Sequence, residues 1–504
     1  MNIVEPVLPA QRSWPLHNVS ATRAIEQDAV AGLEAHALMR RAGAAVAALA
    51  LAVAPHARRV WIAAGPGNNG GDGLDAAIRL KAAGRDVRVT LVAEPARRPA
   101  DAQDALARAR AAGVSIDAPD ESWLASLGAD ELAIDALLGI GVSRPLDGPI
   151  EAAVRRLNGL PCTRLAIDLP SGLDADTGAA GLAVQAHHTL ALITLKPGLF
   201  TGHGRDAAGR VWLADLGVET DGHRPVARLT GADVAGCGVP RLHASHKGSY
   251  GDLAVVGGAT GMTGAALLAA RAASAAGAGR VFVVLLDEGS MAVDPMHPEL
   301  MFRPRGLEEG GLPIDQCTVV AGCGGGDAVR FALPRLLGRA PRLVLDADAL
   351  NAIANDAALQ RLLEARSMRG AATVLTPHPL EAARLLGTDA ASVQADRLAA
   401  ARGLAARTGS IVVLKGSGTI VATPRGELSI NARGTAALAS AGTGDVLAGW
   451  LGGAWAEAGP GAEPARIAVA AVALHGLAAE AVRIGPMPAS ALIEAMRLER
   501  LSAT

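Results

Sequence analysis

The feature that most constrains the fold is a repeated alternation of short apolar segments with longer helical patterns. In the first half, segments that read as buried strands lie at Val60–Ala64, Val87–Val92, Glu131–Ala136 and Thr163–Asp168. Helical patterns separate them at Leu74–Ala83, Asp101–Ala112 and Pro149–Leu157. This alternation predicts a parallel sheet with helices packed on both faces.

The alternation stops over residues 220–241, a candidate linker, and then resumes. We expect further strands at Asp252–Val256, Val281–Leu286, Val319–Ala321, Leu343–Leu345, Thr373–Leu375 and Ile411–Leu414. A helix is expected at Gly264–Ala276, and a hairpin where Thr419–Thr423 closely follows the preceding strand. The chain is therefore predicted to form two α/β domains, residues 1–224 and 225–504, each with three α/β/α layers.

Composition narrows the classes of function. The net charge is −2 and the basic residues are dispersed, so nothing indicates a nucleic-acid partner. The longest apolar run, Ala42–Ala54, is too short to span a bilayer, and we interpret it as a buried helix. The cysteines follow no zinc or disulfide pattern and favour a reducing, cytoplasmic location. They are Cys162, Cys237, Cys317 and Cys323.

Lysine is rare in this chain. Of 47 lysine and arginine residues only four are lysines, at positions 81, 196, 247 and 415. A lysine that persists against such a bias can mark a site where a compact point charge is required and the broad arginine fork does not fit. Chance is the alternative explanation for each of them.

A glycine-rich loop in the second half, Gly442-Thr443-Gly444-Asp445, precedes a helical pattern. Free backbone N–H groups and the helix dipole attract anions at such a position, and glycines let a phosphate approach the backbone. The loop therefore predicts a phosphate site beside the carboxylate of Asp445. A simple helix cap is the alternative role for this aspartate.

Other polar segments of the second half follow predicted strands or open the domain. They are Ser245–Gly251, Asp346-Ala347-Asp348-Ala349-Leu350-Asn351, Thr376-Pro377-His378-Pro379-Leu380-Glu381 and Lys415-Gly416-Ser417-Gly418-Thr419. Because the carboxyl ends of parallel strands meet at one edge of a sheet, the segments that follow strands are expected to gather there.

With these motifs, residues 230–500 resemble the ADP-dependent NAD(P)H-hydrate dehydratases, which have a ribokinase-like fold. The resemblance implies that Asp445 is the base that deprotonates the C6 hydroxyl of hydrated NADH or NADPH, and that ADP, with Mg²⁺, phosphorylates it. Implied contacts to the hydrate are Ala265, Gly322, His378 and Asp445. Implied contacts to the nucleotide are Lys415, Gly416, Ser417, Gly418, Thr419, Gly442, Thr443 and Gly444.

The chain departs from the family pattern in three loops. The family usually has Gly-Pro-Gly-Leu-Gly where this chain has Gly322-Cys323-Gly324-Gly325-Gly326. It usually has Gly-Asn-x-Gly where this chain has Gly434-Thr435-Ala436-Ala437, and a glycine where this chain has Ala441. These differences concern the local shape of the loops more than the chemistry.

The first half carries its own set of polar loops. Gly65–Gly73, with the sequence Gly-Pro-Gly-Asn-Asn-Gly-Gly-Asp-Gly, is expected to be a loop that joins a strand to a helix. Asp135 and Asp168 stand at two further strand ends. With Leu38–Gly43 and Lys196-Pro197-Gly198, this set resembles the NAD(P)H-hydrate epimerases over residues 20–220, which implies a Rossmann-like domain.

The epimerase resemblance implies a second site. Asp168 would be the catalytic acid and base that interconverts the R and S hydrates. Implied substrate contacts are Asn68, Asn69, Gly70, Gly71, Asp72, Gly139, Ile140, Gly141, Val142, Ser143, Arg144, Pro145 and Asp168. A potassium ion would be held by Asn69, Asp135 and Ser171, whose oxygen ligands suit a hard cation.

The leading hypothesis is a cofactor-repair enzyme with both activities. Its small-molecule partners would be NADHX, NADPHX and ADP, its products AMP and phosphate, and we expect a homo-oligomer without a membrane partner. One alternative is a ribokinase-type small-molecule kinase fused to a nucleotide-binding domain. In another alternative, the first half is a non-enzymatic nucleotide sensor that regulates the second half.

Overall fold

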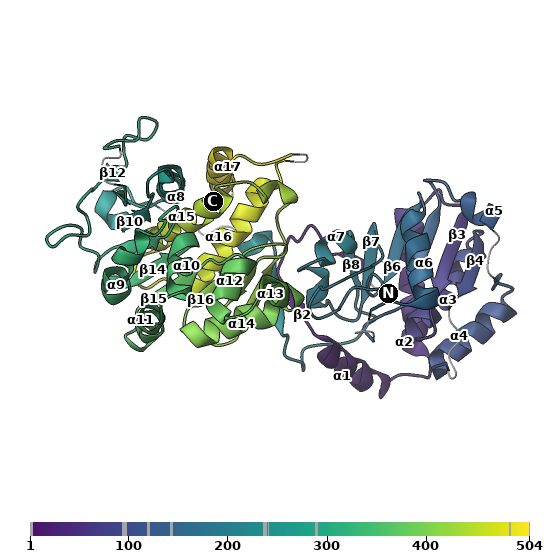
Figure 1. The fold of residues 1–504 in the computed structure, drawn as a ribbon. Helices are drawn as coiled ribbons and strands as arrows, with labels where there is room; N and C mark the ends of the chain where they lie inside the picture. Colours follow the sequence, from purple (N-terminus) through teal and green to yellow (C-terminus); the bar gives the residue numbers. More distant parts are fainter. Residues whose placement is uncertain are drawn as a thin grey trace. The chain divides into compact units, whose positions relative to one another are not determined.

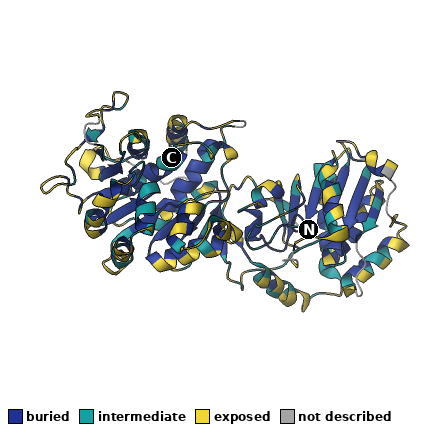
Figure 2. Ribbon diagram, viewed as in Figure 1, coloured by how far each residue is buried: buried dark blue, intermediate teal, exposed yellow. Residues whose placement is uncertain are grey.

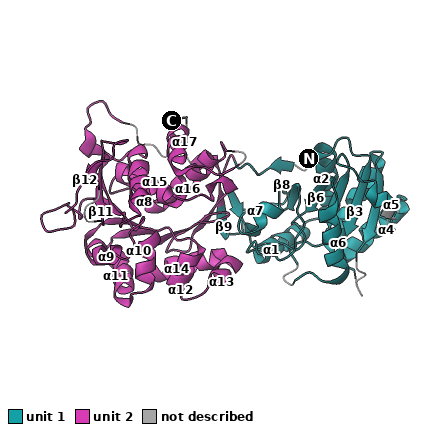
Figure 3. Ribbon diagram, turned by 45° about the horizontal axis from the view of Figure 1, so that its top comes forward, with its two compact units in different colours: residues 1–10, 14–228 teal, residues 11–13, 229–504 magenta. Residues whose placement is uncertain are grey.

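The computed structural model describes residues 4–92, 98–117, 121–141, 145–234, 239, 241–287, 291–482 and 485–502. The chain forms two compact units (Figure 3). Unit 1 comprises Met1–Ala10 and Trp14–Arg228, and unit 2 comprises Gln11–Ser13 and Leu229–Thr504. Both units are α/β structures, which confirms the predicted fold class.

Unit 1 contains a seven-stranded sheet in the order β1-β8-β7-β6-β5-β3-β4. Its strands are β1 (Val4–Pro6), β3 (Arg59–Ala64), β4 (Asp86–Leu91), β5 (Leu132–Ala136), β6 (Thr163–Ile167), β7 (His188–Leu192) and β8 (Arg210–Ala214). All neighbours pair in parallel except β1 and β8. Its helices are α1 (Val19–Val30), α2 (Ala37–Val53), α3 (Asn68–Ala82), α4 (Ala100–Ala111), α5 (Glu121–Ala125), α6 (Gly148–Gly159) and α7 (Gly204–Ala207).

Alternate residues of the unit 1 strands face two different cores. Ile62 and Ala64 of β3 belong to a core that includes residues of α2, α3 and α4. Trp61 and Ala63 of the same strand belong to the core formed with α5 and α6. Because successive side chains of a strand point to opposite faces, this division gives three layers. The apolar run at Ala42–Ala54 lies mostly within α2, as predicted.

The expected loop at Gly65–Gly73 is wrong over its second half, because α3 begins at Asn68. Tertiary packing overrides the low helix propensity of the glycines here. A Cβ atom at Gly70 would lie 2.1 Å from the Gly65 carbonyl oxygen, and one at Gly73 would lie 2.6 Å from the Cβ of Ala136. These glycines therefore let the first turns of α3 approach the sheet closely.

The sheet of unit 2 runs in the order β12-β11-β10-β13-β14-β15-β16-β17-β18. These strands are β10 (Asp252–Gly257), β11 (Arg280–Leu285), β12 (Met301–Phe302), β13 (Thr318–Ala321), β14 (Arg342–Leu345), β15 (Ala372–Leu375), β16 (Ile411–Leu414), β17 (Ile420–Ala422) and β18 (Leu428–Asn431). Pairing is parallel from β12 to β16 and antiparallel from β16 to β18, which confirms the hairpin.

Helices cover both faces of the unit 2 sheet (Figure 1). One layer contains α8 (Thr263–Ala275), α15 (Thr443–Ala458), α16 (Pro464–Ala479) and α17 (Ala489–Ser502), which share a core with the sheet. The other contains α9 (Val329–Arg339), α10 (Ala347–Ala354), α11 (Ala357–Met368), α12 (Pro379–Leu386), α13 (Ala390–Ala395) and α14 (Arg397–Thr408). Figure 2 shows the strands buried between helices whose outer faces are exposed.

The segment expected to be a linker is not free of regular structure. It contains the short strand β9 (Ala227–Thr230), which pattern reading missed because its sequence, Ala-Arg-Leu-Thr, has no run of apolar residues. Among the described residues, the remaining short strand is β2 (Trp14–Leu16).

Candidate active sites

Unit 1 contains a cavity of about 400 Å³ at the carboxyl ends of β3, β5 and β6. The lining comes from strand-end loops and from α1, α2 and α3. Of the predicted residues, it includes Asn68, Asn69, Asp72, Gly139, Ile140, Gly141 and Asp168. The motifs that were expected to meet at one edge of the sheet therefore do so.

Some predicted epimerase residues have a different place. Gly70 and Gly71 do not line the cavity, and a Cβ atom on Gly71 would lie 2.7 Å from the Cε of Met39. Pro145 is exposed and is not part of the lining. Val142, Ser143 and Arg144 lie outside the described residues.

Asp168 follows β6 and is held by a buried lysine. Its backbone has a φ of 66°, a left-handed conformation that is uncommon for a residue other than glycine. Its Oδ1 accepts a hydrogen bond from Lys196 Nζ at 2.5 Å, and the same ammonium donates to the Leu192 carbonyl at 2.8 Å. Backbone strain of this kind is found at functional sites, where surrounding contacts fix it.

Three further acids, Asp72, Glu26 and Asp101, line the cavity with Asp168. Burial, and next the charge of Asp168, raise the pKa of Asp72 well above its ordinary value. The same two causes raise the pKa of Glu26, which lies on α1. Sequence reasoning missed Glu26 and omitted Lys196 from the site, although the rarity of lysine had singled out Lys196.

The three proposed potassium ligands only partly line the cavity. Asp135 is fully buried and accepts hydrogen bonds from Ser171, from its backbone N–H at 2.8 Å and from its hydroxyl at 2.6 Å. Burial raises the pKa of Asp135 to about 6, although the hydrogen bonds from Ser171 oppose this shift. Asn69 lines the cavity, and its buried side-chain Nδ2 has no hydrogen-bond partner.

In unit 2, the glycine-rich loop begins α15 as expected. Gly442 is the N-cap residue with a φ of 86°, and no side chain caps this helix end. Asp445 lies in the first turn, and its carboxylate accepts a hydrogen bond from the thiol of Cys323. The helix end therefore keeps the arrangement expected of an anion site, and Asp445 does not act as its cap.

A lysine also lies at the edge of this sheet. Lys415 Nζ is 2.7 Å from Oδ1 of Asp346, which also accepts a hydrogen bond from the Thr376 hydroxyl at 2.7 Å. A Cβ atom built on Gly444 would lie 3.4 Å from the same Nζ. The ammonium group of Lys415 thus lies between a buried carboxylate and the predicted phosphate loop.

Asp445 has a perturbed environment. Burial, and next the charge of Asp346, raise its pKa to about 6, while the thiol hydrogen bond and Lys415 lower it. A base with a pKa near neutrality is suited to accept a proton from an alcohol. His475 of α16 supports the loop, because its Nε2 lies 3.0 Å from the Thr443 carbonyl oxygen.

His378 was predicted to contact the hydrate, and it also caps α12. Its Nδ1 accepts hydrogen bonds from the backbone N–H groups of Leu380 and Glu381, at 3.1 and 3.3 Å. Glu381 in turn accepts from the His378 backbone N–H at 2.8 Å. Burial raises the pKa of Glu381 to about 7, although Lys415 opposes the shift.

The other predicted dehydratase residues surround the Cys323 loop or follow β16. A Cβ atom on Gly322 would lie 1.9 Å from the Asp346 carbonyl oxygen, and one on Gly324 would lie 2.9 Å from the Cβ of Ala265. Residues 415–419 join β16 to β17, and Gly416 packs against the guanidinium of Arg397.

Two separate α/β units, each with a lysine and carboxylates at the carboxyl edge of a parallel sheet, define the class as a two-domain α/β enzyme. Residues 35–198 match the family model described as YjeF-related protein N-terminus. Residues 253–497 match the model described as NAD(P)H-hydrate dehydratase.

Whole-length relatives complete the identification. The bifunctional NAD(P)H-hydrate repair enzyme Nnr of Escherichia coli (strain K12) is 37% identical, over 90% of this chain and 87% of the relative. The enzyme of the same name from Coxiella burnetii is 34% identical, over 91% of this chain and 93% of the relative. The chain belongs to the family of bifunctional NAD(P)H-hydrate repair enzymes.

Solved structures resemble unit 2. The ADP/ATP-dependent NAD(P)H-hydrate dehydratase from Bacillus subtilis, co-crystallised with ATP and Mg²⁺, is 28% identical. The match covers 54% of this chain and 96% of that chain, with a TM-score of 0.46.

Within the described residues, no helix combines the length and apolarity needed to cross a membrane.

Proposed function

We propose that unit 1 interconverts the R and S epimers of hydrated NADH and NADPH, and that unit 2 dehydrates the S epimer at the expense of ADP. The observation that supports this most directly is the arrangement of Asp445. It lies in the first turn of a glycine-capped helix, within reach of a buried lysine–carboxylate pair. A phosphoryl group and an alcohol can both be placed there.

In unit 2, Asp445 takes the proton of the C6 hydroxyl as that oxygen attacks the β-phosphate of ADP. The backbone N–H groups of Gly442–Gly444 and the ammonium of Lys415 stabilise charge on the transferring phosphoryl group. Phosphate then leaves C6 and C5 loses a proton, which restores the C5=C6 double bond of the dihydropyridine ring. AMP and phosphate are the by-products. Residues 415–419 hold the adenylate portion, and Ala265, Gly322 and His378 contact the hydrate.

Mg²⁺ would enter with ADP and neutralise charge on its phosphate oxygens. The chain's own contribution is the phosphate loop and Lys415, which orient the same oxygens. The B. subtilis relative crystallised with ATP and Mg²⁺ supports this use of a magnesium nucleotide.

In unit 1, Asp168 relays a proton from Asp72 or Glu26 to the C6 hydroxyl, which leaves as water when the C6–O bond breaks. It then accepts a proton from the water molecule that adds to either face of C6. Lys196 compensates the charge of Asp168 and fixes its orientation. Asp72 and Glu26, whose pKa values are raised, supply protons next to it. The walls formed by Asn68, Asn69 and Gly139–Gly141 hold the hydrate.

Asn69, Asp135 and Ser171 would hold potassium, which would supply a fixed positive charge beside the cavity. The fit rests on two features. Asp135 is a fully buried carboxylate with no cationic partner within the described residues. The side-chain Nδ2 of Asn69 is buried without a hydrogen-bond partner. A rotation of this amide by 180° places its oxygen at that position, where it can bind a cation.

The test is an assay with acid-treated NADH, which contains both epimers. ADP and the enzyme should restore the near-ultraviolet absorbance of the reduced nicotinamide ring and consume both epimers. Asp168→Asn should leave the R epimer unconsumed, apart from its slow spontaneous epimerisation, while the S epimer still disappears. Failure to restore the absorbance would refute the dehydratase activity, and unchanged use of the R epimer by Asp168→Asn would refute the role of Asp168.

A further inference from the structure

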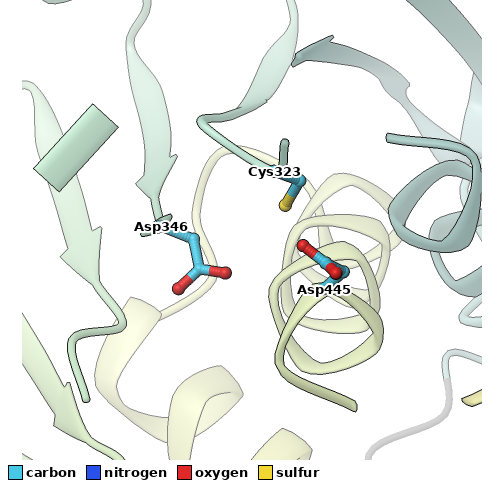
Figure 4. A group of neighbouring side chains, drawn as sticks. All are labelled: Cys323, Asp346 and Asp445. Carbon is cyan, nitrogen blue, oxygen red and sulfur yellow. The ribbon is translucent and has the colours of Figure 1, made fainter. Parts of the chain in front are cut away.

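A thiol and two carboxylates converge at the edge of the unit 2 sheet (Figure 4). Cys323 comes from the loop after β13, Asp346 directly follows β14, and Asp445 lies on α15. One potential ligand atom from each lies within 4.8 Å of the other two. Among the described residues, no other group of three histidine, cysteine, aspartate or glutamate side chains meets this distance.

The charge around this group is unbalanced. Asp346 is almost fully buried and is paired with Lys415 at 2.7 Å. Asp445 has no cationic side chain within 4.0 Å in the described part of the chain, and its partner is a neutral thiol. Two carboxylates therefore share one ammonium group, an arrangement in which a bound cation offsets the remaining charge.

The donor set indicates the kind of cation. Magnesium and potassium prefer oxygen ligands alone, whereas a thiolate with two carboxylates suits zinc and softer divalent ions. Ligand atoms around tetrahedral zinc are about 3.5 Å apart, given bonds of about 2.0–2.3 Å. Small side-chain rotations would bring the three atoms from their present spacing to this one.

We propose that Cys323, Asp346 and Asp445 form a binding site for a zinc-like divalent cation, and that its occupation blocks the dehydratase. On binding, the Cys323 thiol loses its proton to solvent and the thiolate bonds to the metal, because a coordinating thiol is deprotonated. Asp445 binds the metal through its carboxylate and can no longer accept the substrate proton. Lys415 remains on Oδ1 of Asp346, which leaves Oδ2 for the metal.

The site is a property of this chain's loop. Where Cys323 stands, the family pattern has proline, which offers no ligand. The inhibitory part of the proposal rests on the proposed dehydratase function, whereas the binding part does not.

The first experiment measures binding without turnover. The metal-free full-length enzyme is titrated with Co²⁺, a spectroscopic probe for zinc sites, and with Zn²⁺ in competition with a chelating dye. The wild type should show a thiolate-to-cobalt charge-transfer band that Cys323→Ser lacks. Cys317→Ser is the matched control, because Cys317 is another fully buried free cysteine of unit 2.

Zinc affinity of Cys323→Ser should fall at least about 10–100-fold, the cost of losing even an outer-shell partner of a metal. Asp445→Asn should also weaken zinc binding, so the conclusion does not rest on one variant. Circular dichroism shows whether each variant is folded. Absence of the band in the wild type, or an unchanged band in Cys323→Ser, overturns the site.

The second experiment measures zinc inhibition of S-hydrate dehydration, with each variant compared to its own metal-free rate. Wild type and Cys317→Ser should be inhibited, and Cys323→Ser should need a much higher zinc concentration. Equal inhibition of all three would overturn the inhibitory role. If no variant dehydrates the hydrate at all, the proposed function fails while the cobalt titration still decides the metal site.

Discussion

In unit 1, the buried Lys196 pairs with Asp168, the residue proposed to act on the substrate itself. In unit 2, Lys415 pairs with Asp346, while the proposed base Asp445 lies beside a thiol. Both lysines follow parallel strands and reach a carboxylate at the same edge of their sheet. The two units thus use the same kind of pair for different purposes.

The difference concerns how each reactive carboxylate is prepared. Asp168 has a direct ammonium partner. Burial, and next the charge of Asp168, raise the pKa values of its neighbours Asp72 and Glu26, which can therefore act as acids. Asp445 has no such partner, and its own pKa rises to about 6. A carboxyl with this pKa is largely ionised at neutral pH and is a better base than an ordinary aspartate.

The largest expected effect is at Asp445. Asp445→Asn should lower kcat for dehydration of the S epimer by about 10²–10⁴-fold, since loss of a general base has this cost. Epimerisation should be unchanged, because the substitution lies in the other unit. The measurement is recovery of nicotinamide absorbance with ADP, together with chromatographic analysis of the two epimers.

Asp168→Asn is the matched control, because it should have the opposite pattern: normal dehydration of the S epimer and loss of epimerisation. If Asp445→Asn retains activity, the carboxylate has only a local structural role. If each substitution impairs both reactions, the two sites are not independent.

Lys196→Met should destabilise unit 1 by about 3–5 kcal/mol, because it leaves the charge of Asp168 buried without a partner. Lys415→Met should cost less, since the Lys415 side chain is 20% exposed and that of Lys196 only 1%. Urea unfolding measures the loss of unfolding free energy. Amide hydrogen exchange of α3, in unit 1, and α15, in unit 2, shows which unit is destabilised.

Lys81→Met is the control in unit 1, because Lys81 is exposed on α3. It should change the free energy of unfolding by less than about 0.5 kcal/mol. A similar loss in Lys81→Met and Lys196→Met would show that the Lys196–Asp168 pair is not the source of the stability.

Glycines of the Gly65–Gly73 motif and of the Gly442–Asp445 loop are expected to have different roles. Gly73→Ala should destabilise unit 1 by about 1–3 kcal/mol, because the new Cβ would lie 2.6 Å from the Cβ of Ala136 and overpack the core. Gly444→Ala should leave unfolding nearly unchanged, since its Cβ would meet only the flexible end of Lys415 at 3.4 Å. It should instead raise the KM for ADP by narrowing the phosphate loop.

Thermal unfolding and ADP kinetics of the two variants test this contrast. If Gly444→Ala loses stability without a change in the KM for ADP, Gly444 is required for packing and not for nucleotide binding. Unchanged stability in Gly73→Ala would remove the packing explanation for the start of α3 at Asn68.

The sequence predicted which loops meet, because parallel strands deliver their carboxyl-end loops to one edge. Asp168, Asp346 and Lys415 were placed there by strand position alone. The partner of each lysine depends on side-chain packing, which periodicity does not encode. Glu26 and His475 come from helices outside every motif, so no pattern could have assigned them to a site.

The smallest expected effect concerns the charge around Lys415, and it depends on pH. Folding raises the pKa of Glu381 from 4.5 to about 7, so the folded protein favours the protonated carboxyl. The resulting destabilisation is absent below pH 4.5, grows as pH rises to about 7 and is constant above that. Glu381→Gln mimics the protonated form and should therefore be more stable than the wild type at alkaline pH, by on the order of 1 kcal/mol.

The advantage of Glu381→Gln should disappear near the unfolded pKa of 4.5, where wild-type Glu381 is protonated in the folded state. Urea unfolding across this pH range measures the difference directly. Glu364→Gln on α11, at a side chain that is 43% exposed, is a control that should show no such trend. If the difference in unfolding free energy does not depend on pH, the hydrogen bond from the His378 backbone N–H to Glu381 determines it, and not the charge of Glu381. The negative charge around Lys415 in unit 2 would then be balanced, as it is around Lys196 in unit 1.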